Sequence, residues 1–504
     1  MTRRGFTTDG FKGSYVWGLM AGTAALTALS QTGPAHAETL REALAKAYVS
    51  NPSLEASRAD QRATDEDVPI ARSSGLPDLS IASTHIEFLK RSPNSFTAPA
   101  RALTVGPDLT IPIYAGGAIR NSIKAAKERV AAGQAGLRGA ESSIFSQVVA
   151  AYMDVLRTEA LVALAQNQVD VLTVNLEATR DRFEIGDLTR TDIAQSESRL
   201  ALAQSDMQNS RANLIGARED YIRLVGNAPG NLEAPPPLPG LPATVGEAVV
   251  IALDSNPDLI AAKERAEAAG YDSEVAGSGR LPTVGAFGNY DYTDYYGTLG
   301  GPIASNFTQS EKTANVGVQI TIPIFQGGAP AARQRQAFAR ETSALENVIA
   351  TERLVIDDVR SSYSSWRASN AVIESSQAAV SAAELSLEGV KAENSIGNRS
   401  ILDVLNAEQE LLSARAQLVT ARRNAYVAGF ALLATMGRAE ARDLNLDTDG
   451  LLYDPQINYE RVRGQIFDWQ RDPEPEAKSL STAEIPAPDA SITPMDDTND
   501  VTDD

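Results

Sequence analysis

The sequence of 504 residues lacks cysteine and contains only two histidines, His36 and His85. The absence of cysteine excludes disulfide bonds, thiolate catalysis, cysteine-ligated zinc and a lipid carried on an N-terminal cysteine. Two histidines are too few for a histidine-rich metal centre. Because the sequence also contains no G-x-S-x-G, P-loop or H-E-x-x-H motif, we expect no catalytic site, no metal and no cofactor.

Basic residues are in the minority, since 45 Lys and Arg oppose 65 Asp and Glu and the net charge is −20. Nucleic acid is therefore not an expected partner, because its phosphates require a basic surface. Part of the acidic excess lies at the end of the chain, where residues 472–504 hold ten acidic residues and one lysine. That segment is rich in Pro, Ser, Thr and Asp, and its composition predicts an acidic disordered tail.

Runs of 18 apolar residues are absent after residue 37, so we expect no membrane-spanning helix. Before it, three basic residues precede the apolar run YVWGLMAGTAALTAL at 15–29 and the small-residue sequence AHA at 35–37. This order is typical of a secretory signal peptide, assigned to residues 1–37, with the mature chain beginning near Glu38. Arg3-Arg4 also fits a twin-arginine signal, so both export routes stay open. Any membrane span of the exported chain must be built from strands.

The chain contains an internal duplication. The stretch TIPIYAGG at 110–117 returns as TIPIFQGG at 321–328, an offset of 211 residues. The Asn-Pro-x-Leu stretch at 51–54 returns at 256–259 with an offset of 205 residues, so the second copy has gained residues in a loop between the two motifs. We therefore divide the chain into a first repeat, a proline-rich linker and a second repeat, at residues 38–232, 233–242 and 243–450.

Each copy contains a run of about 12 residues in which apolar and polar side chains alternate. The apolar positions extend over 103–113 in the first copy and over 314–324 in the second. A period of two predicts a strand with one apolar and one polar face, and this length suits a tilted membrane strand. Partner strands are expected near 77–90 and 281–296, the second with tyrosines suited to the aromatic girdle of a membrane barrel.

The duplicated motif ends each strand and begins a helix. A proline late in the strand is tolerated where no partner needs its N–H, and the following pair of glycines allows a sharp exit. These predicted strand-to-helix junctions consist of Pro112, Gly116, Gly117, Pro323, Gly327 and Gly328.

After the first glycine pair the apolar residues follow a heptad spacing. This predicts a helix over 118–182, which is 65 residues or about 98 Å long and typical of a coiled coil. Its heptad positions have three polar exceptions, Glu141, Thr158 and Thr179. A shorter helix returns after the turn IGDLT at 185–189, and the turn IGNRS at 396–400 reverses the chain in the second copy.

The most specific stretches of the sequence are TIPIFQGG, GNRSILDVLNAEQELL at 397–412 and the two Asn-Pro-x-Leu stretches. In these stretches the sequence resembles the TolC family of outer-membrane efflux and secretion channels. The resemblance covers roughly residues 38–450. It implies a homotrimer in the outer membrane, in which each protomer gives four strands to one shared 12-stranded β-barrel and its helices to one periplasmic α-helical tunnel. It also implies a belt midway along the tunnel, formed around 228–248 and 438–465, and we assign residues 451–471 to this belt.

Oligomerisation also follows from the strands themselves. Four strands cannot close a barrel, because closed barrels begin near eight strands. Open strand edges are not tolerated in lipid, so several copies must share one barrel.

The resemblance implies a periplasmic gate at the helix turns. There, Arg399 and Asp192 would form a latch that joins neighbouring coiled coils, and Asp403 would contribute to an acidic ring that attracts cations. Arg399 precedes Asp403 by four residues, so we expect both on one helical face, and Asp192 is the counterpart of Asp403 in the first copy. The family often has an Asp at the position of Asn406 and a Tyr at that of Asn394, so the ring is expected to be weaker and the latch to lack one hydrogen bond. The alternative is an ordinary solvated ion pair.

The same resemblance implies that the hairpin tips of a periplasmic adaptor, or membrane fusion protein, dock at the turns. Simple turn chemistry is the alternative explanation for the glycines, because glycine fits the left-handed position at a helix end. The expected docking residues are Gly186, Thr189, Gly397 and Ser400.

The expected function is that of a passive exit duct in a tripartite efflux pump or a type I secretion system. Its partners would be an adaptor, an inner-membrane pump or ABC transporter that supplies the energy, and the lipid of the outer membrane. A periplasmic coiled-coil adaptor without a pore is the second hypothesis, which the two matched strand pairs disfavour. A secreted enzyme is the third, which the lack of catalytic motifs disfavours.

Overall fold

A computed structural model describes residues 37–492, apart from 91–96, 447–449 and 451. The signal peptide expected at 1–37 lies almost entirely outside the described residues, as does the end of the acidic tail at 493–504. In the described part of the chain, no helix has both the length and the apolar character needed to cross a bilayer.

Four antiparallel strands form one sheet in the order β1-β2-β3-β4. The central pair, β2 and β3, joins the two repeats, with Leu109 opposite Gly288. The strand predicted for the second copy is β4, in which nearly all residues are exposed in one protomer, among them Val316, Val318 and Ile320. The strands comprise β1 (Asp78–Glu87), β2 (Arg101–Ala115), β3 (Thr283–Asp294) and β4 (Ser310–Thr321).

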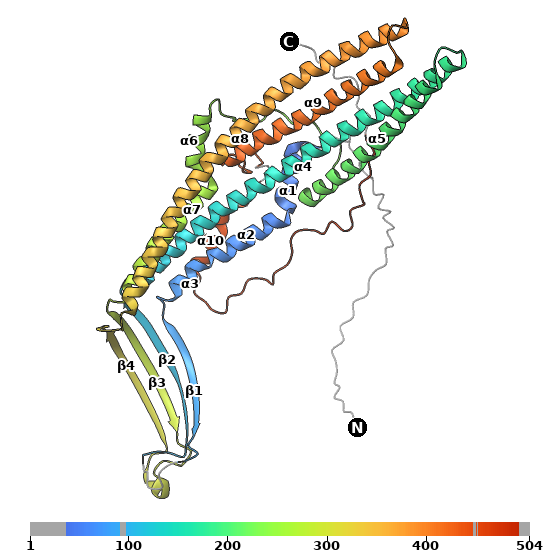
Figure 1. Ribbon diagram of the computed structural model, residues 1–504. Coiled ribbons are helices and arrows are strands. Elements are labelled where there is room, and N and C mark those ends of the chain that lie inside the picture. The colour runs from blue at the N-terminus through green and yellow to red at the C-terminus, as the bar shows by residue number, and fades with distance from the viewer. Residues whose placement is uncertain (1–36, 91–96, 447–449, 451, 493–504) are drawn as a thin grey trace, which may run out of the picture.

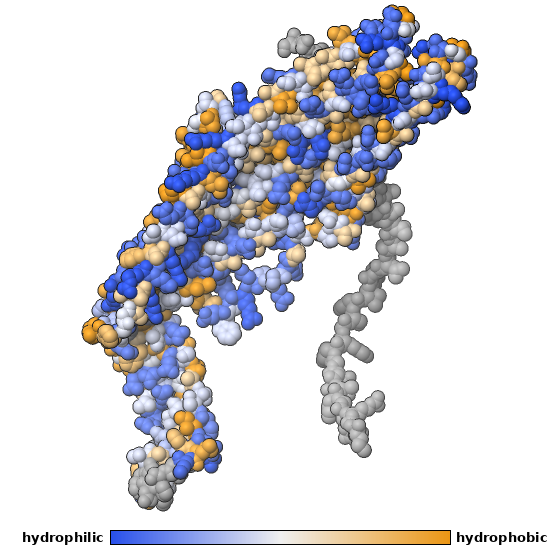
Figure 2. All heavy atoms as spheres, in the orientation of Figure 1, coloured by the Kyte–Doolittle hydropathy of each residue, from blue (hydrophilic) through white to orange (hydrophobic). Residues whose placement is uncertain are grey.

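The strand in the second copy is shorter than expected. β4 ends at Thr321, so Pro323 lies beyond the strand and not within it. The reason is that its only neighbour in the sheet, β3, begins at Thr283, which pairs with Thr321 and leaves the next residues without a partner. Pro112 does lie within β2, opposite Gly285. Apolar residues project beside the end of β4 at the junction of sheet and helices (Figure 2), where Ile324 is exposed.

Two long helical hairpins lie side by side above the sheet (Figure 1). Gly117 and Gly328 have φ angles of 88° and 81° and immediately precede the two longest helices, which confirms the sharp exit expected there. Both of those helices have 67 residues. The hairpins consist of α4 (Ala118–Glu184) with α5 (Arg190–Val225), and of α8 (Ala329–Ser395) with α9 (Ile401–Thr435).

Shorter helices lie within each repeat, and one more follows the second repeat. They comprise α1 (Leu40–Ser50), α2 (Pro52–Asp65), α3 (Asp67–Ser73), α6 (Val245–Ser255), α7 (Pro257–Ser278) and α10 (Pro455–Val462), with a 3-10 turn η1 (Gly301–Asn306) between β3 and β4.

The two Asn-Pro-x-Leu stretches perform the same double task. The side-chain oxygens of Asn51 and Asn256 cap α2 and α7 by accepting hydrogen bonds from backbone N–H groups. Their amide nitrogens donate to the carbonyl oxygens of Leu224 and Thr435, each at 2.9 Å. One side chain therefore starts a short helix and fixes it to the end of the returning helix of its own repeat.

The main core lies midway along the long helices. Its largest fully buried side chains include Phe145 and Tyr152 of α4, Tyr221 of α5 and Phe430 of α9. Both segments expected to form the belt take part in this core. Ala439, Ala441 and Leu446 belong to it, and the residues that pack against it include Leu232, Leu238, Leu241, Leu452 and Tyr453.

The polar exceptions in the heptad pattern of α4 are all satisfied. The hydroxyls of Thr158 and Thr179 donate to carbonyl oxygens one turn earlier in the helix, each at 2.7 Å. Glu141 accepts a hydrogen bond from the backbone N–H of Ala441. Burial raises the pKa of Glu141 to about 7, although this hydrogen bond acts in the opposite direction.

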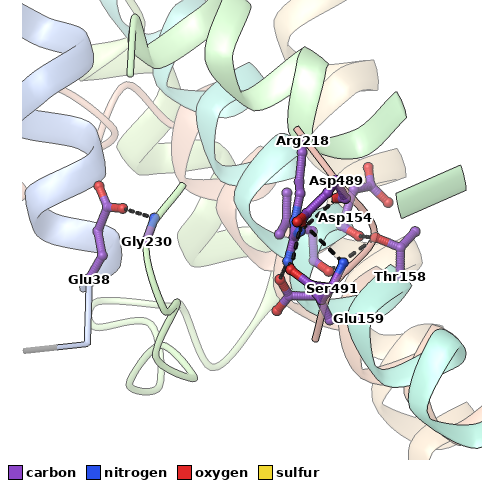
Figure 3. Close-up of polar contacts among 9 residues, drawn as sticks. Glu38, Asp154, Thr158, Glu159, Arg218, Gly230, Asp489 and Ser491 are labelled. Atoms are coloured by element: carbon purple, nitrogen blue, oxygen red, sulfur yellow. Dashed lines mark hydrogen bonds and ion pairs between the residues drawn. The ribbon is translucent and has the colours of Figure 1, made fainter. Parts of the chain in front are cut away.

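The first residue after the expected cleavage site is held in the core. Glu38 is only 6% exposed, and its carboxylate accepts hydrogen bonds from Lys46 Nζ at 2.6 Å and Tyr221 Oη at 2.9 Å. It also accepts a hydrogen bond from the Gly230 N–H at 2.9 Å (Figure 3). Burial acts to raise the pKa of Glu38, but the hydrogen bonds from Lys46 and Gly230 hold it below the usual value. These hydrogen bonds anchor Glu38, the residue at which the mature chain is expected to begin, to α1, α5 and the segment after α5.

The described part of the acidic tail, residues 472–492, differs from the disorder expected for it. We call it the C-terminal strap. Asp472 pairs with Arg461 at 2.9 Å, and Arg218 of α5 donates to the carbonyl oxygens of Asp489 and Ser491 at 2.8 and 2.9 Å (Figure 3). Arg218 also pairs with Glu159 of α4 at 2.7 Å. Composition alone cannot reveal the contact with Arg218, because this arginine lies 271 positions from Asp489 in the sequence.

Arg218→Met should release the strap from α5, because methionine keeps the apolar stem but removes all of these hydrogen bonds. We expect faster loss of the C-terminal fragment under limited proteinase K digestion, followed by intact mass. Arg223→Met is the matched control, since Arg223 pairs only within α5 with Asp220 among the described residues. Equal rates for the two variants would show that Arg218 does not hold the strap.

Glu141 should make stability depend on pH. Its folded pKa of about 7 lies above its usual value of 4.5, so the folded state binds more protons and stability falls as pH rises between these values. The loss is at most about 3 kcal/mol. Glu141→Gln should therefore lose less apparent Tm than the wild type between pH 5.5 and 8. Glu388→Gln, at an exposed position of α8, is the control and should behave as the wild type.

Candidate functional site

The two hairpin turns lie at the same end of the molecule, far from the sheet (Figure 1). Gly186 and Gly397 have φ angles of 84° and 79°, in the region that favours glycine. No described atom lies within 4 Å of a Cβ built at either position, so backbone conformation alone requires glycine there. The turn chemistry expected for both glycines is confirmed.

The residues after the glycines form matching caps. Thr189 donates through its backbone N–H and hydroxyl to Asp192 Oδ2 at 2.8 and 2.7 Å, and Ser400 does the same to Asp403 Oδ2 at 3.0 and 2.7 Å. Each threonine or serine also accepts from the N–H of its aspartate, which completes a capping box. Asp192 and Asp403 are therefore structural counterparts in the two repeats.

These caps keep both carboxylates charged. The backbone and side-chain hydrogen bonds from Thr189 lower the pKa of Asp192, and those from the side chain and backbone of Ser400 lower the pKa of Asp403. The tips therefore present two fixed negative charges next to helix N-termini, where the helix dipole also favours an anion.

Arg399 lies outside the helix on which we expected it. Since Ser400 is the N-cap of α9, Arg399 belongs to the turn, and the prediction that it shares a helical face with Asp403 is wrong. Its guanidinium Nε pairs with Glu393 Oε2 of α8 at 2.7 Å. The described chain thus brings Arg399 to Glu393 and Asp192 to Thr189, and the Arg399–Asp192 latch between coils stays a prediction.

Both departures from the family pattern have partners. Asn394 Nδ2 donates to the carbonyl oxygen of Arg399 at 2.8 Å, so this side chain shapes the turn that carries the arginine. Asn406 Oδ1 accepts from Arg199 Nη2 of α5 at 2.9 Å, which links the two hairpins within one protomer.

An ion pair close to the tips was not predicted from the sequence; its carboxylate is buried and its lysine is half exposed. Glu408 of α9 is 4% exposed, lies 3.2 Å from Lys391 Nζ of α8, and accepts from Asn175 Nδ2 of α4 at 2.9 Å. The sequence gives only a weak indication of this ion pair, which is that Glu408 occupies the heptad position between Leu405 and Leu412. An acidic residue in an apolar row is the only pattern by which it could have been found.

One acidic group among the described residues has the spacing to hold a cation. Carboxylate oxygens of Glu128, Glu264 and Glu267, on α4 and α7, lie within 4.8 Å of one another. Burial and the hydrogen bond with Glu128 raise the pKa of Glu264, so protonation is a sufficient way to relieve their repulsion. This group is remote from the tips.

The sheet, the hairpins and the charged tips together define a protomer of an outer-membrane channel. Residues 43–227 and 248–438 each match the family model described as outer membrane efflux protein. The chain belongs to this family. The two matched segments lie on either side of the proline-rich linker.

Relatives and solved structures agree with this assignment. The chain is 33% identical to the outer membrane efflux protein BepC of Brucella suis biovar 1 (strain 1330), covering 89% of this chain and 96% of BepC. It is 26% identical to the outer membrane protein TolC of Escherichia coli (strain K12), covering 85% and 88%. The CmeC outer membrane channel of Campylobacter jejuni matches with a TM-score of 0.69 and 17% identity over 84% of this chain and 89% of CmeC.

Fold, location and general function follow from the family. The fold is that of the trimeric outer-membrane channels, in which a β-barrel continues into an α-helical tunnel. The protein is an outer-membrane channel with its helices in the periplasm, and serves as an exit duct for efflux or secretion. Members of the family are channel and transport proteins, and TolC-like channels work as trimers with adaptor proteins and inner-membrane pumps.

Removal of a cap hydroxyl should loosen one tip. Ser400→Ala and Thr189→Ala should each cost about 1 kcal/mol in the first turn of α9 or α5. Amide hydrogen exchange should then be faster in that turn and unchanged in the other. Ser413→Ala, in the exposed middle of α9, replaces a hydroxyl that bonds back to its own helix and serves as the control. Unchanged exchange in the capped turns would contradict the role of the capping boxes.

Proposed function

We propose that three copies form a passive exit duct that is closed at the helix tips and opens when the tips rearrange. The observation that carries this proposal is the matched pair of capped turns, which presents Asp192 and Asp403 at the end of the molecule farthest from the sheet. In a trimer, each aspartate occurs three times around one axis. Such rings of carboxylates attract cations toward a tunnel entrance.

The latch would form between copies or between hairpins when Arg399 exchanges Glu393 for Asp192. Two features support this exchange. Arg399 and Glu393 are both half exposed, so solvent screens their mutual attraction and the pair is weak. Both capping bonds to Asp192 end on Oδ2, so Oδ1 remains an acceptor for an arriving guanidinium. A latch between two exposed side chains such as Arg399 and Asp192 would also be weak, so modest binding energy from a partner could break it.

The turns would also receive that partner. The proposed docking residues, Gly186, Thr189, Gly397 and Ser400, lie on the two turns that border the entrance. An adaptor that binds there could release Arg399 from its latch and join the duct to an inner-membrane pump or ABC transporter. Both a tripartite efflux pump and a type I secretion system have this plan, and the duct itself needs no energy source.

Arg399→Ala should raise single-channel conductance of the purified protein in planar bilayers, because it removes the latch. Arg415→Ala is the matched control: Arg415 of α9 likewise pairs with a glutamate of α8, Glu384, at 2.7 Å and with similar exposure, but it lies 16 residues farther along the chain than Arg399. If both variants conduct as the wild type does, the protein is a pore but the proposed Arg399–Asp192 latch is wrong. A well-folded trimer without any conductance would contradict the proposal that the protein is an exit duct.

Asp403→Asn should lower cation selectivity of the same channel, since it removes one charge per protomer and keeps a side chain that can accept from Ser400. Reversal potentials in a salt gradient measure this. Unchanged selectivity would place the acidic ring elsewhere in the tunnel.

A further inference from the structure

An exposed aromatic segment follows α10. Ile466, Phe467 and Trp469 are 54, 76 and 88% exposed, and all three lie within four residues. Single exposed apolar side chains are ordinary on protein surfaces. Three in one short segment form a patch, and such patches mark contacts with proteins or membranes.

The segment is fixed to the helical body at its start. Arg72 of α3 donates from Nη1 to the carbonyl oxygen of Arg463 at 3.1 Å. Tyr459 of α10 packs against the small cluster that contains Val68 of α3. The N–H of Gln470 donates to the carbonyl oxygen of Phe467 at 3.2 Å, which closes a turn that presents the aromatic side chains outward.

Its attachment point lies next to the membrane strands. Arg72 precedes the first residue of β1, Asp78, by six residues, which is at most roughly 20 Å of chain. Figure 1 shows the coil after α10 passing beside the end of α3, at the level where the sheet begins. In Figure 2 this coil projects from the helical body beside the sheet. The aromatic residues therefore lie near the plane at which the strands enter the bilayer.

The composition of the segment suits the interface of a bilayer. Tryptophan prefers the headgroup level, where its ring is partly apolar and its N–H can find a partner. Arg463 and Arg471 flank the apolar residues and can meet lipid phosphates, while Asp468 between them opposes deep insertion into hydrocarbon.

We propose that residues 464–471 form an interfacial anchor, in which Phe467 and Trp469 insert into the headgroup region of the periplasmic leaflet of the outer membrane. The occupant of the patch is phospholipid, because the coil that carries the patch passes beside the end of α3, at the level where the membrane sheet begins. The anchor would fix the helical tunnel against tilting relative to the bilayer. This inference is independent of the gate at the opposite end of the molecule.

Fluorescence can test the anchor, because Trp366 and Trp469 are the only tryptophans after residue 37. Trp366→Phe leaves Trp469 as the single reporter in the full-length mature trimer. Trp469→Phe leaves Trp366, which lies 37 residues into α8 from Ala329, or about 55 Å from the membrane end of that helix. Both variants are reconstituted into phosphatidylcholine vesicles with and without bromine at a shallow acyl position.

The anchor predicts that brominated lipid lowers the emission of Trp469 and leaves that of Trp366 unchanged. The emission of Trp469 should also shift to shorter wavelength on transfer from a short detergent to vesicles. Unquenched emission at long wavelength would mean that the segment faces water, and unquenched emission at short wavelength would mean that a protein surface covers it. Either result overturns the proposal. If Trp366→Phe does not fold, the wild-type spectrum minus that of Trp469→Phe gives the same reading.

Discussion

The free edges of β1 and β4 are the constraint on which the rest of the molecule depends. Within the described chain, each of these strands pairs with one neighbour only. A bilayer offers no water to satisfy free N–H and C=O groups, so each edge must pair with a strand of another copy. Register across those edges then fixes the copies relative to one another. The positions of the strands then fix the starts of the two long helices, because these helices begin directly after the glycines at 117 and 328.

The unequal burial of the two long helices follows from that constraint. α4 buries a long row of side chains within its own protomer, whereas α8 buries few among the described residues and exposes Phe338, Leu345 and Ile349. Both helices have the same length and the same kind of start. The difference arises because α4 packs against α5 of its own hairpin and against α9 of the other, while α8 lies at the border of the protomer, where a neighbouring copy can cover it.

Much of this architecture could be predicted from the sequence because it repeats simple periods. The alternation before Gly117 and the heptads after it gave the strands and the first long helix to within a few residues. The end of β4 was misjudged because alternation continues to Ile324, although pairing stops where β3 begins. Local pattern cannot report the length of a partner strand.

The site was predicted less completely, because its contacts are distant in sequence. The equivalence of Asp192 and Asp403 was visible in the repeat, but the position of Arg399 outside α9 depends on which residue caps the helix. The ion pair of Glu408 with Lys391 and the contacts of Arg218 with the C-terminal strap join residues 17 and 271 positions apart. No short motif contains such pairs.

The hairpins extend far beyond the core, so a small rotation at the core produces a large displacement at their tips. From Phe145 in the core to Glu184 at the tip, α4 runs 39 residues, or roughly 60 Å. A rotation of 5° at the core would therefore move the tip by about 5 Å, which is close to the pitch of one helical turn. Because capping boxes stiffen both tips, little of such a rotation would be lost to fraying. Small repacking around the four large aromatic side chains of the core would thus be enough to move the hairpin tips by this distance.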